Sequence, residues 1–284
     1  MKQDIDAFLD YLRTEKSCSQ NTIAAYRNDL NQLATHVDGE RSKGTITSND
    51  DLLKSYLISL RGKGYSSATA ARKVASAKSF FRFLVEVGKL KENPLRNLIP
   101  PQVKRHVPKF LSQGEYRRLL GQATRLSSLE AKRDVVMLEL LYATGLRVSE
   151  LVSLNVKDID LEQSCVHCVH GSSKRRIPFD YRTRELLSIF LENDRLDLLY
   201  DEKQDALFLN RRGGRLTRQG FWQITKNYAS RAGLDGQITP QTLRHSFAAH
   251  KIQSGSDLHS VQQALGHVYA SSTRIYKRPA SSLR

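Results

Sequence analysis

The chain has 284 residues, with 39% hydrophobic and 26% charged side chains and a formal net charge of +16. These proportions are typical of a globular protein that is long enough for two hydrophobic cores. They exclude a largely disordered chain, a protein with long apolar membrane spans and, with three cysteines, a disulfide-rich scaffold. The positive charge leaves two interpretations open, a basic surface that only keeps the protein soluble or a nucleic-acid partner. The first residues lack the apolar run of a secretory signal, so we expect a cytoplasmic protein.

Residues 1–97 are predicted to form a domain of four or five helices. Ser19 is a good N-cap for a helix whose apolar residues recur every three or four positions. A second helix with the same spacing follows residues 48–50. The apolar residues that we assign to the core from these two helices are Ile23, Tyr26, Leu30, Leu33, Val37, Leu52, Leu53, Tyr56, Leu57 and Leu60.

A third helix is predicted from about Ser67 to the breaker residues Gly88 and Pro94. Its inward face is apolar and consists of Val74, Ala77, Phe80, Phe81 and Leu84. Its outward face, toward solvent or DNA, is basic and consists of Arg72, Lys73, Lys78 and Arg82. The segment therefore combines a hydrophobic core with a positive surface, which favours the nucleic-acid interpretation of the net charge.

Residues 98–108 are predicted to be an interdomain linker. Pro100, Pro101 and Pro108 prevent a regular helix or a central strand there. Three basic or titratable residues, at positions 104–106, suit a chain that crosses a DNA backbone, although an ordinary solvated hinge explains them nearly as well. The second domain then covers residues 109–284.

In the second domain, a helix carrying Val135, Leu138 and Leu141 is expected to stop at Gly145, a typical C-cap residue. A new helix begins directly afterwards, which places Arg147 at or near its N-terminus. The unpaired backbone N–H groups and the dipole of a helix N-terminus favour an anion. Arg147 is therefore a candidate anion ligand.

A small antiparallel sheet is predicted from the β-like segments 165–169 and 177–179, with a third strand at 206–209. Residues 171–175 join the first two strands, so Lys174 is expected in the hairpin turn. The segment 220–233 and most of the chain after Thr242 are predicted to be helical. The predicted fold class is mainly α, a two-domain DNA clamp with a helical N-terminal domain and an α-rich second domain that contains the small sheet.

The sequence Cys165, His167, Cys168 and His170 has the residue types of a zinc site. On a strand, the first two side chains face one way and the last two face the other. Four ligands cannot converge from this arrangement without a bulge. We therefore predict no metal ion here.

Three short motifs follow one another near the C-terminus. They are Leu243-Arg244-His245, Leu265-Gly266-His267 and Arg274-Ile275-Tyr276. Together with Arg147, Glu150 and Lys174 upstream, they resemble the tyrosine recombinase (phage integrase) family, most closely its Xer-like members. The resemblance also allows a transposon-encoded cointegrate resolvase of the tyrosine type. The resemblance spans nearly the whole chain. It implies a SAM-like core-binding domain over residues 1–97 and a catalytic domain over residues 109–284.

The resemblance implies that Arg147 and Arg244 gather around one scissile phosphate, where a guanidinium can donate two parallel hydrogen bonds and stays charged. Tyr276 is then the nucleophile and forms a covalent 3′-phosphotyrosyl link to DNA. The new ester conserves the bond energy, so the reaction needs no ATP, metal or other cofactor. Lys174 is the expected general acid for the leaving hydroxyl, and His267 contacts the phosphate or helps to position the attack.

Glu150, one helical turn after Arg147, is expected to accept a hydrogen bond from that guanidinium. Position 241 departs from the family pattern, in which a histidine stands three residues before the second arginine. Gln241 can donate a hydrogen bond to a phosphoryl oxygen but cannot accept a proton near pH 7. The hairpin before Lys174 is shorter than in Xer-like proteins, and eight residues follow Tyr276, a short tail for docking onto a neighbouring subunit.

The expected partner is a double-stranded DNA recombination site, bound by a homotetramer on two sites or together with a second recombinase, with no membrane partner. The expected role is resolution of cointegrates or of chromosome or plasmid dimers, or DNA integration. Two alternatives stay open. One is a family member with weakened catalysis that acts as a DNA-binding accessory or regulatory protein, and the other is a relaxing topoisomerase with related chemistry.

Overall fold

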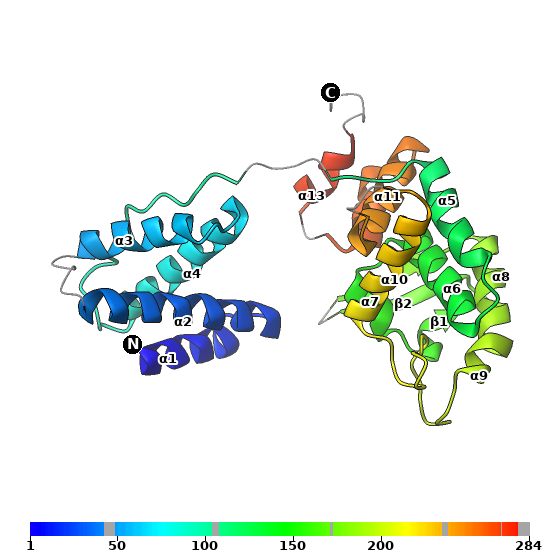
Figure 1. Cartoon of the computed structure of the whole chain (residues 1–284), viewed down its shortest axis with the longest axis horizontal. Coiled ribbons are helices and arrows are strands. Elements are labelled where there is room, and N and C mark those ends of the chain that lie inside the picture. Colours follow the sequence, from blue (N-terminus) through cyan, green and yellow to red (C-terminus); the bar gives the residue numbers. More distant parts are fainter. Residues whose placement is uncertain (43–48, 104–107, 171–172, 235–237, 268, 278–284) are drawn as a thin grey trace. The chain divides into compact units, whose positions relative to one another are not determined.

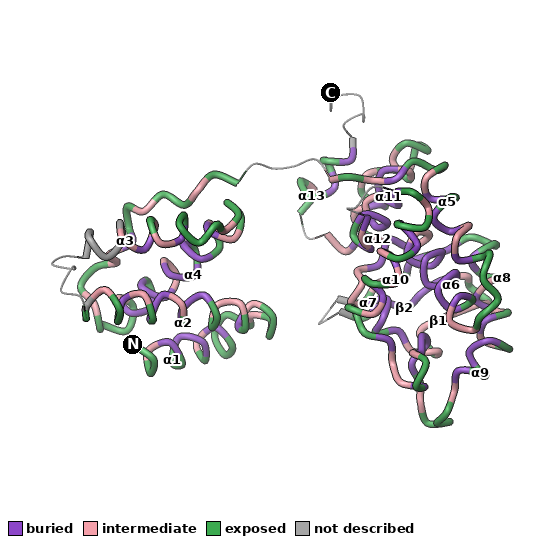
Figure 2. The backbone as a smooth tube through the Cα atoms, viewed as in Figure 1, coloured by how far each residue is buried: buried purple, intermediate pink, exposed green. Residues whose placement is uncertain are grey.

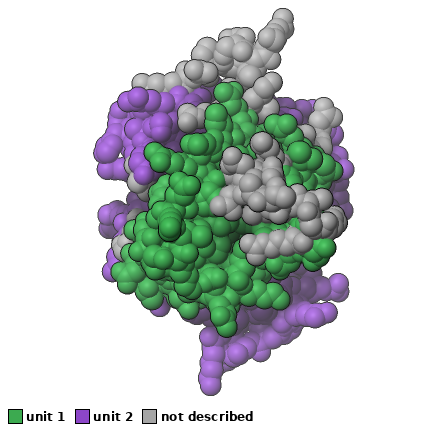
Figure 3. Space-filling view, turned by 90° about the vertical axis from the view of Figure 1, so that its left-hand side faces the viewer, with its two compact units in different colours: residues 1–106 green, residues 107–284 purple. Residues whose placement is uncertain are grey.

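The computed structural model describes residues 1–42, 49–103, 108–170, 173–234, 238–267 and 269–277, with the backbone alone for residues 41, 49–54, 170, 173 and 277. The chain forms two compact units, residues 1–106 and 107–284 (Figures 1 and 3). Both units are mainly helical, and the second contains a small antiparallel sheet. The predicted fold class is confirmed in these features.

Unit 1 contains four helices in its described part. They are α1 (Lys2–Thr14), α2 (Gln20–Ser42), α3 (Asn49–Gly62) and α4 (Ser67–Glu86). Ser19 caps α2 as predicted, since the backbone N–H of Thr22 donates to its hydroxyl at 3.2 Å. Ser66 caps α4 in the same way, and Gly88 follows the end of α4 with a φ of 73°.

The apolar stripes predicted for α2 and α4 form the core of unit 1 around Phe8, Leu30 and Phe80, all of which are fully enclosed. Phe8 comes from α1 and contacts the rings of Phe80 and Phe83. The side chains of residues 52 and 53, which we expected in this core, lie outside the described residues. Burial of aromatic side chains is the main stabilising contribution to such a small core.

One outward prediction in α4 is wrong. Lys73 is only 3% exposed, and its Nζ lies 2.9 Å from the buried carboxylate of Asp29 on α2, which Arg72 also contacts. Arg72 and Arg82 are exposed as predicted, and Lys78 is half-buried and donates to backbone carbonyls that follow the helix. A buried carboxylate on another helix satisfies the Lys73 ammonium, and no local pattern reveals such a partner.

The described elements of unit 2 run from α5 to a short 3₁₀ turn. Its helices and helical turns are α5 (Gln113–Thr124), α6 (Leu129–Thr144), α7 (Val148–Ser153), η1 (Val156–Asp158), α8 (Tyr181–Ile189), the π-helical turn η2 (Phe190–Asp194), α9 (Arg195–Asp197), α10 (Arg218–Arg231), α11 (Pro240–Gln253), α12 (Leu258–Leu265), α13 (Ser271–Arg274) and η3 (Ile275–Lys277). Helix α6 is buried along most of its length (Figure 2) and packs against α5, α8 and α11. In the described parts of the chain, no helix is long and apolar enough to cross a membrane.

The sheet of unit 2 has the strand order β1 (Ile159–Asp160), β2 (Cys165–His170) and β3 (Ser173–Pro178), all antiparallel. Lys174 pairs with Val169 inside the β2–β3 ladder. It therefore lies in a strand and not in the hairpin turn, and our prediction of its position was wrong. Residues 171 and 172, which we expected in the turn, lie outside the described residues.

The third predicted strand, at 206–209, was also wrong. This segment is buried but makes isolated bridges, in which the N–H of Leu207 donates to the carbonyl of Leu154 and the N–H of Leu216 donates to the carbonyl of Phe208. Its apolar residues are in the core of unit 2, where loop partners satisfy its backbone. The third strand is β1 instead, which pairs with β2.

Candidate active site

The local chain path around Gly145 positions the first arginine of the candidate site. Gly145 ends α6 in the left-handed conformation, with φ 62°, and Arg147 is the N-cap residue of α7. Both predictions are confirmed. A Cβ atom at position 145 would lie 2.3 Å from the ring of Phe247 on α11, so the close approach of the two helices requires glycine.

The carboxylate of Glu150 holds two guanidinium groups. Its side chain is 1% exposed and accepts from the backbone N–H of Arg147 at 2.7 Å and from Nη1 of Arg147 at 2.8 Å. Arg175 on β3 donates to both oxygens of the same carboxylate, at 3.0 and 2.6 Å. Burial by itself would raise the pKa of Glu150, but the hydrogen bonds from Arg175 and Arg147 outweigh it and lower the pKa. Glu150 is therefore ionised and fixes both arginines.

Two arginines that are far apart in the sequence meet at the end of α12. Nη2 of Arg147 donates to the carbonyl of Gly266 at 2.7 Å, and Nη2 of Arg244 donates to the preceding carbonyl, that of Leu265, at 2.6 Å. Nη1 of Arg244 donates to the carbonyl of Gly145 at 2.6 Å. Because successive carbonyls hold the two guanidinium groups, both side chains are fixed next to each other.

The two arginines line one pocket of about 310 Å³. Gln241 and His267 line it as well, and Arg218, in the first turn of α10, contributes a further cation. Gln241 is exposed in the first turn of α11, where the helix N-terminus adds a favourable potential for anions. The structure thus brings four of the six predicted site residues to one pocket.

Gly266 permits the close approach of this cationic cluster. It ends α12 with φ 61°, and a Cβ atom there would lie 2.5 Å from Nη1 of Arg175 and 3.4 Å from Nη1 of Arg147. Nε of Arg175 also donates to the carbonyl of Ala264 at 3.1 Å. The end of α12 is therefore clamped between two arginines from other parts of unit 2.

Arg244 is only 4% exposed, and its burial together with the charge of Arg147 lowers its pKa to about 10, although Glu150 acts in the opposite direction. The guanidinium stays charged at neutral pH. The group of Arg147, Arg175, Arg244 and Glu150 carries a net charge of +2 in a largely dehydrated place. A phosphate oxygen is a suitable ligand for such a group.

Tyr276 lies in η3 and is 6% exposed. Its hydroxyl is 2.5 Å from Nδ1 of His245, the residue that follows Arg244 on α11. Burial raises the pKa of Tyr276 to about 12, although the positive charge of Arg244 opposes this rise. The phenol is therefore protonated in the free chain and lies against the helix that carries the second arginine.

His267 lies directly after Gly266 and is held by α13, because its Nδ1 is 2.9 Å from the hydroxyl of Thr273. Burial, with further contributions from Arg244 and Arg147, lowers its pKa to about 4. The ring is neutral near pH 7. With Nδ1 engaged by Thr273, Nε2 is the ring nitrogen that can contact a ligand in the pocket.

Lys174 does not line the pocket of the two arginines. It is exposed on β3 and borders a neighbouring depression of about 460 Å³, which also contains Arg175, Gly266 and His267. Successive side chains on a strand face opposite sides, and Arg175 takes the side that faces Glu150. His267 lines both depressions and connects the surroundings of Lys174 to the pocket.

Three residues of the site were missed in the sequence. The family motifs do not assign a role to Arg175 or Arg218, and His245 was part of a motif without a predicted function. A signal existed only for Arg218, which follows the N-cap residue Thr217 and so begins a helix. The contacts of Arg175 and His245 depend on segments that are distant in the sequence.

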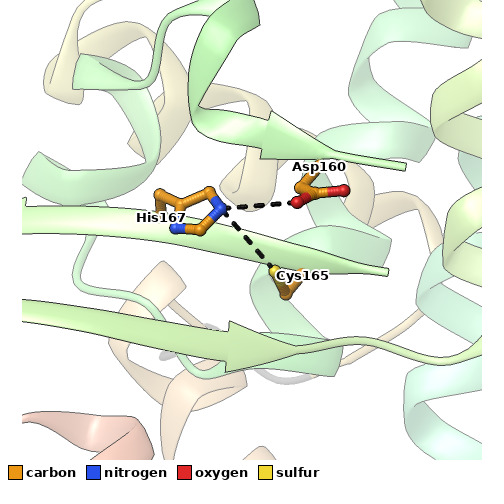
Figure 4. A group of neighbouring side chains, drawn as sticks. All are labelled: Asp160, Cys165 and His167. Carbon is orange, nitrogen blue, oxygen red and sulfur yellow. Dashed lines mark hydrogen bonds and ion pairs between the residues drawn. The ribbon is translucent and has the colours of Figure 1, made fainter. Parts of the chain in front are cut away.

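The sheet contains a separate group of metal-ligand types (Figure 4). Cys165 and His167 share a face of β2 as predicted, with Sγ and Nε2 3.9 Å apart, and Asp160 of β1 lies 3.6 Å from Nε2 of His167. Cys168 faces the core instead. Nε of Arg176 donates to Sγ of Cys165 at 3.1 Å, which places a positive charge next to the thiol. We assign no metal to this group.

Comparison with known proteins identifies the family of the chain. Residues 109–282 match the phage integrase family, and residues 5–88 match the N-terminal SAM-like domain of phage integrases. Tyrosine recombinase XerC of Roseiflexus sp. is 45% identical over 280 residues, which cover 97% of this chain and 89% of that protein. Tyrosine recombinase XerD of Listeria innocua is 39% identical over 282 residues, with 97% and 94% covered.

A solved structure shares the fold. The XerH site-specific recombinase bound to a palindromic difH substrate, in a post-cleavage complex, has 24% identity and a TM-score of 0.74, with 96% of this chain and 91% of that chain covered. The helical N-terminal unit and the α-rich second unit with its small sheet define a protein of the integrase class. This chain belongs to the phage integrase family. Its activity is that of a site-specific tyrosine recombinase, which breaks and rejoins DNA, as predicted.

Proposed function

We propose that the pocket of Arg147 and Arg244 binds the scissile phosphate of a recombination site and that Tyr276 attacks it to form a 3′-phosphotyrosyl intermediate. The observation that carries this proposal is the fixation of both guanidinium groups by the successive carbonyls of Leu265 and Gly266. Their geometry is set before DNA binds, so little reorganisation is needed when charge develops on the phosphoryl oxygens. The net charge of +2 around Glu150 supports the same assignment.

The remaining polar residues complete the reaction. Gln241 and the neutral His267 donate hydrogen bonds to the phosphoryl oxygens, and Lys174 protonates the leaving 5′-oxygen from its mobile side chain on β3. The phosphotyrosyl ester conserves the energy of the broken bond, so strands rejoin without ATP. Proton transfer and positively charged donors suffice for this chemistry, and the scheme includes no metal or organic cofactor.

The DNA partner is a double-stranded recombination site. Residues 1–97 form the core-binding domain and contact the DNA backbone through basic side chains of α4, among them the exposed Arg72 and Arg82. Residues 98–108 connect this domain to the catalytic domain, residues 109–284, and the basic positions 104–106 of the linker lie outside the described residues. The protein works in the cytoplasm, where its DNA substrate is.

The working assembly is a homotetramer on two DNA sites, or a tetramer shared with a second recombinase. Of the eight residues after Tyr276, residues 278–284 lie outside the described residues. The role that we propose is the resolution of chromosome or plasmid dimers or of cointegrates, or DNA integration.

A nicked suicide duplex tests the proposal. The duplex carries a sequence selected from a random pool by binding to the full-length Tyr276→Phe chain, so the selection does not require cleavage. We expect the wild-type chain to form a covalent protein–DNA adduct that is absent in Tyr276→Phe. Tight binding without an adduct would instead support the alternative that this chain is a DNA-binding accessory or regulatory protein. Relaxation of supercoiled DNA without strand exchange would support the alternative that this chain is a relaxing topoisomerase.

A further inference from the structure

The contact between Tyr276 and His245 has no role in the scheme above. The hydroxyl of Tyr276 is 2.5 Å from Nδ1 of His245, and the two ring centroids are 5.6 Å apart with the rings tilted by 44°. We propose that His245 is the catalytic base that accepts the phenolic proton of Tyr276 while the hydroxyl attacks the phosphate. This inference rests on the proposed function of Tyr276 as the nucleophile.

The charge state of the pair sets the direction of the hydrogen bond. Burial and the neighbouring Arg244 lower the pKa of His245 to about 4, so the imidazole is neutral near pH 7. The phenol is protonated because burial raises the pKa of Tyr276 to about 12. The hydroxyl is therefore the donor and Nδ1 the acceptor, which leaves the ring proton of His245 on Nε2. Among the described residues, the titratable or charged groups that interact with this imidazole are Arg244 on the same helix, Tyr276 on η3 and His267 after α12.

The other candidate bases are less suitable. Gln241 occupies the position of the family histidine and cannot accept a proton near pH 7. Nδ1 of His267 is engaged by Thr273, and this ring lies next to Arg147 and Arg244, where a hydrogen-bond donor to the phosphate is needed. His245 is the imidazole that contacts the phenolic oxygen.

The proton stays on Tyr276 until DNA is bound. An imidazolium pKa of about 4 and a phenol pKa of about 12 make transfer strongly unfavourable in the free chain. Two changes reverse this on the DNA. The negative phosphate next to Arg244 favours the imidazolium, and the phenolic oxygen loses basicity as its bond to phosphorus forms. The pair therefore keeps the nucleophile inactive in the absence of substrate.

The step is balanced in atoms and charge. The Oη–P bond forms, the P–O5′ bond breaks, and the phenolic proton moves to Nδ1 of His245. The 5′-oxygen receives its proton from Lys174, the acid of the proposed function. On religation the 5′-hydroxyl attacks phosphorus, Lys174 takes its proton back, and the imidazolium of His245 returns its proton to the phenolic oxygen.

A second tyrosine–histidine pair, with its histidine on α11 and its tyrosine on α6, provides a matched control. Nδ1 of His250 is 2.6 Å from the hydroxyl of Tyr142, and this ring is also half-buried. The pair does not line the pocket of the two arginines. His250→Ala removes the same type of hydrogen bond from the same helix and leaves the candidate site intact.

The test is the single-turnover rate of adduct formation on the nicked duplex selected with Tyr276→Phe, measured from about pH 5 to pH 9. We expect His245→Ala to slow adduct formation by about 100-fold at neutral pH and to leave the affinity for the duplex unchanged. The rate of His245→Ala should rise with pH over the range in which the wild-type rate is constant. Added imidazole should restore part of the rate in His245→Ala. His250→Ala should retain the wild-type rate and pH profile.

Two outcomes would overturn the inference. A wild-type adduct that depends on Tyr276 but forms at the same rate and with the same pH profile in His245→Ala would exclude the base role and leave the recombinase intact. No wild-type adduct at all would remove the proposed function and this inference with it.

A measurement on the unaltered full chain avoids dependence on the folding of His245→Ala. Nitrogen-15 NMR of labelled histidines should show His245 with an unprotonated Nδ1 that shifts in Tyr276→Phe. A proton on Nδ1 would contradict the proposed direction of the hydrogen bond. The His245→Gln variant, which keeps a polar side chain of similar length, assigns the signal.

Discussion

Replacement of Glu150 by glutamine is the most informative perturbation of the site. The carboxylate accepts four hydrogen bonds, two from Arg147 and two from Arg175, and its side chain is 1% exposed. Glutamine has a similar shape but no charge, and its amide group would face guanidinium donors. The variant therefore leaves two guanidinium groups without their anionic partner.

The loss of unfolding free energy expected for Glu150→Gln depends on how exposed the side chains of Arg147 and Arg175 are. Removal of one member of a buried charged group costs about 3 to 5 kcal/mol. The side chain of Arg175 is 10% exposed and that of Arg147 is 35% exposed, so water recovers part of the loss at Arg147. We expect Glu150→Gln to lower the free energy of unfolding of unit 2 by about 3 kcal/mol. For a domain of this size, the midpoint of thermal unfolding should fall by about 6 to 12 °C.

Denaturant unfolding followed by fluorescence measures this effect. The chain has one tryptophan, Trp222 on α10, so the signal reports on unit 2. Glu130→Gln is the matched control, because Glu130 pairs with Arg211 at 3.7 Å on the surface of the same unit. Such an exposed pair contributes less than about 1 kcal/mol.

The pH dependence provides a second check. The pKa of Glu150 is lowered in the folded state, so its contribution is complete above the unfolded pKa of about 4.3. It is lost as pH falls through the lower, folded pKa. The difference between the wild type and Glu150→Gln should thus be largest near neutral pH and shrink in acid. Equal unfolding midpoints for Glu150→Gln and Glu130→Gln, or a difference that does not change with pH, would refute this reasoning.

Three further changes have expected outcomes. Gly266→Ala should abolish adduct formation and destabilise unit 2 more than Gly255→Ala does. Both glycines have positive φ, but only a Cβ atom at position 266 would meet Arg175, at 2.5 Å. Equal effects of the two substitutions in denaturant unfolding would exclude the clash. Asp29→Asn should speed hydrogen exchange in α2 and α4, since it removes the buried carboxylate that lies 2.9 Å from the ammonium group of Lys73. Unchanged exchange would show that the Lys73–Asp29 pair does not stabilise the two helices. Gln241→His should leave the rate of adduct formation unchanged or raise it, and a loss of more than about tenfold, or about 1.4 kcal/mol of barrier, would mean that this residue is misplaced in the proposed site.

Local features predicted much of the fold correctly. Ser19 and Gly145 act within one or two turns of chain, so their capping roles follow from the residues beside them. The apolar stripes of α2, α4 and α6 also predicted their buried faces, because helical periodicity is a local property. The strand predicted at 206–209 was wrong, because a buried apolar segment can form its backbone hydrogen bonds with loops as well as within a sheet.

The sequence by itself determined the family, the helical class and the short motifs that contain Arg147, Arg244, His267 and Tyr276. Such motifs are contiguous and can be recognised without coordinates. The place of Arg147 at the start of α7 also follows from the glycine two residues earlier.

Only the tertiary structure decided which of these side chains touch. It joined Arg175 to Glu150, put Lys174 in a strand, buried Lys73 against Asp29 and set His245 against Tyr276. The contacts of Arg175, Lys73 and His245 link segments that are distant in the sequence, whereas Lys174 pairs with the nearby strand β2. The residue types on either side permit many partners. In unit 1 the packing of α2 against α4 selects among them, and in unit 2 the packing of α11, α12 and the sheet around the carboxylate of Glu150 does so.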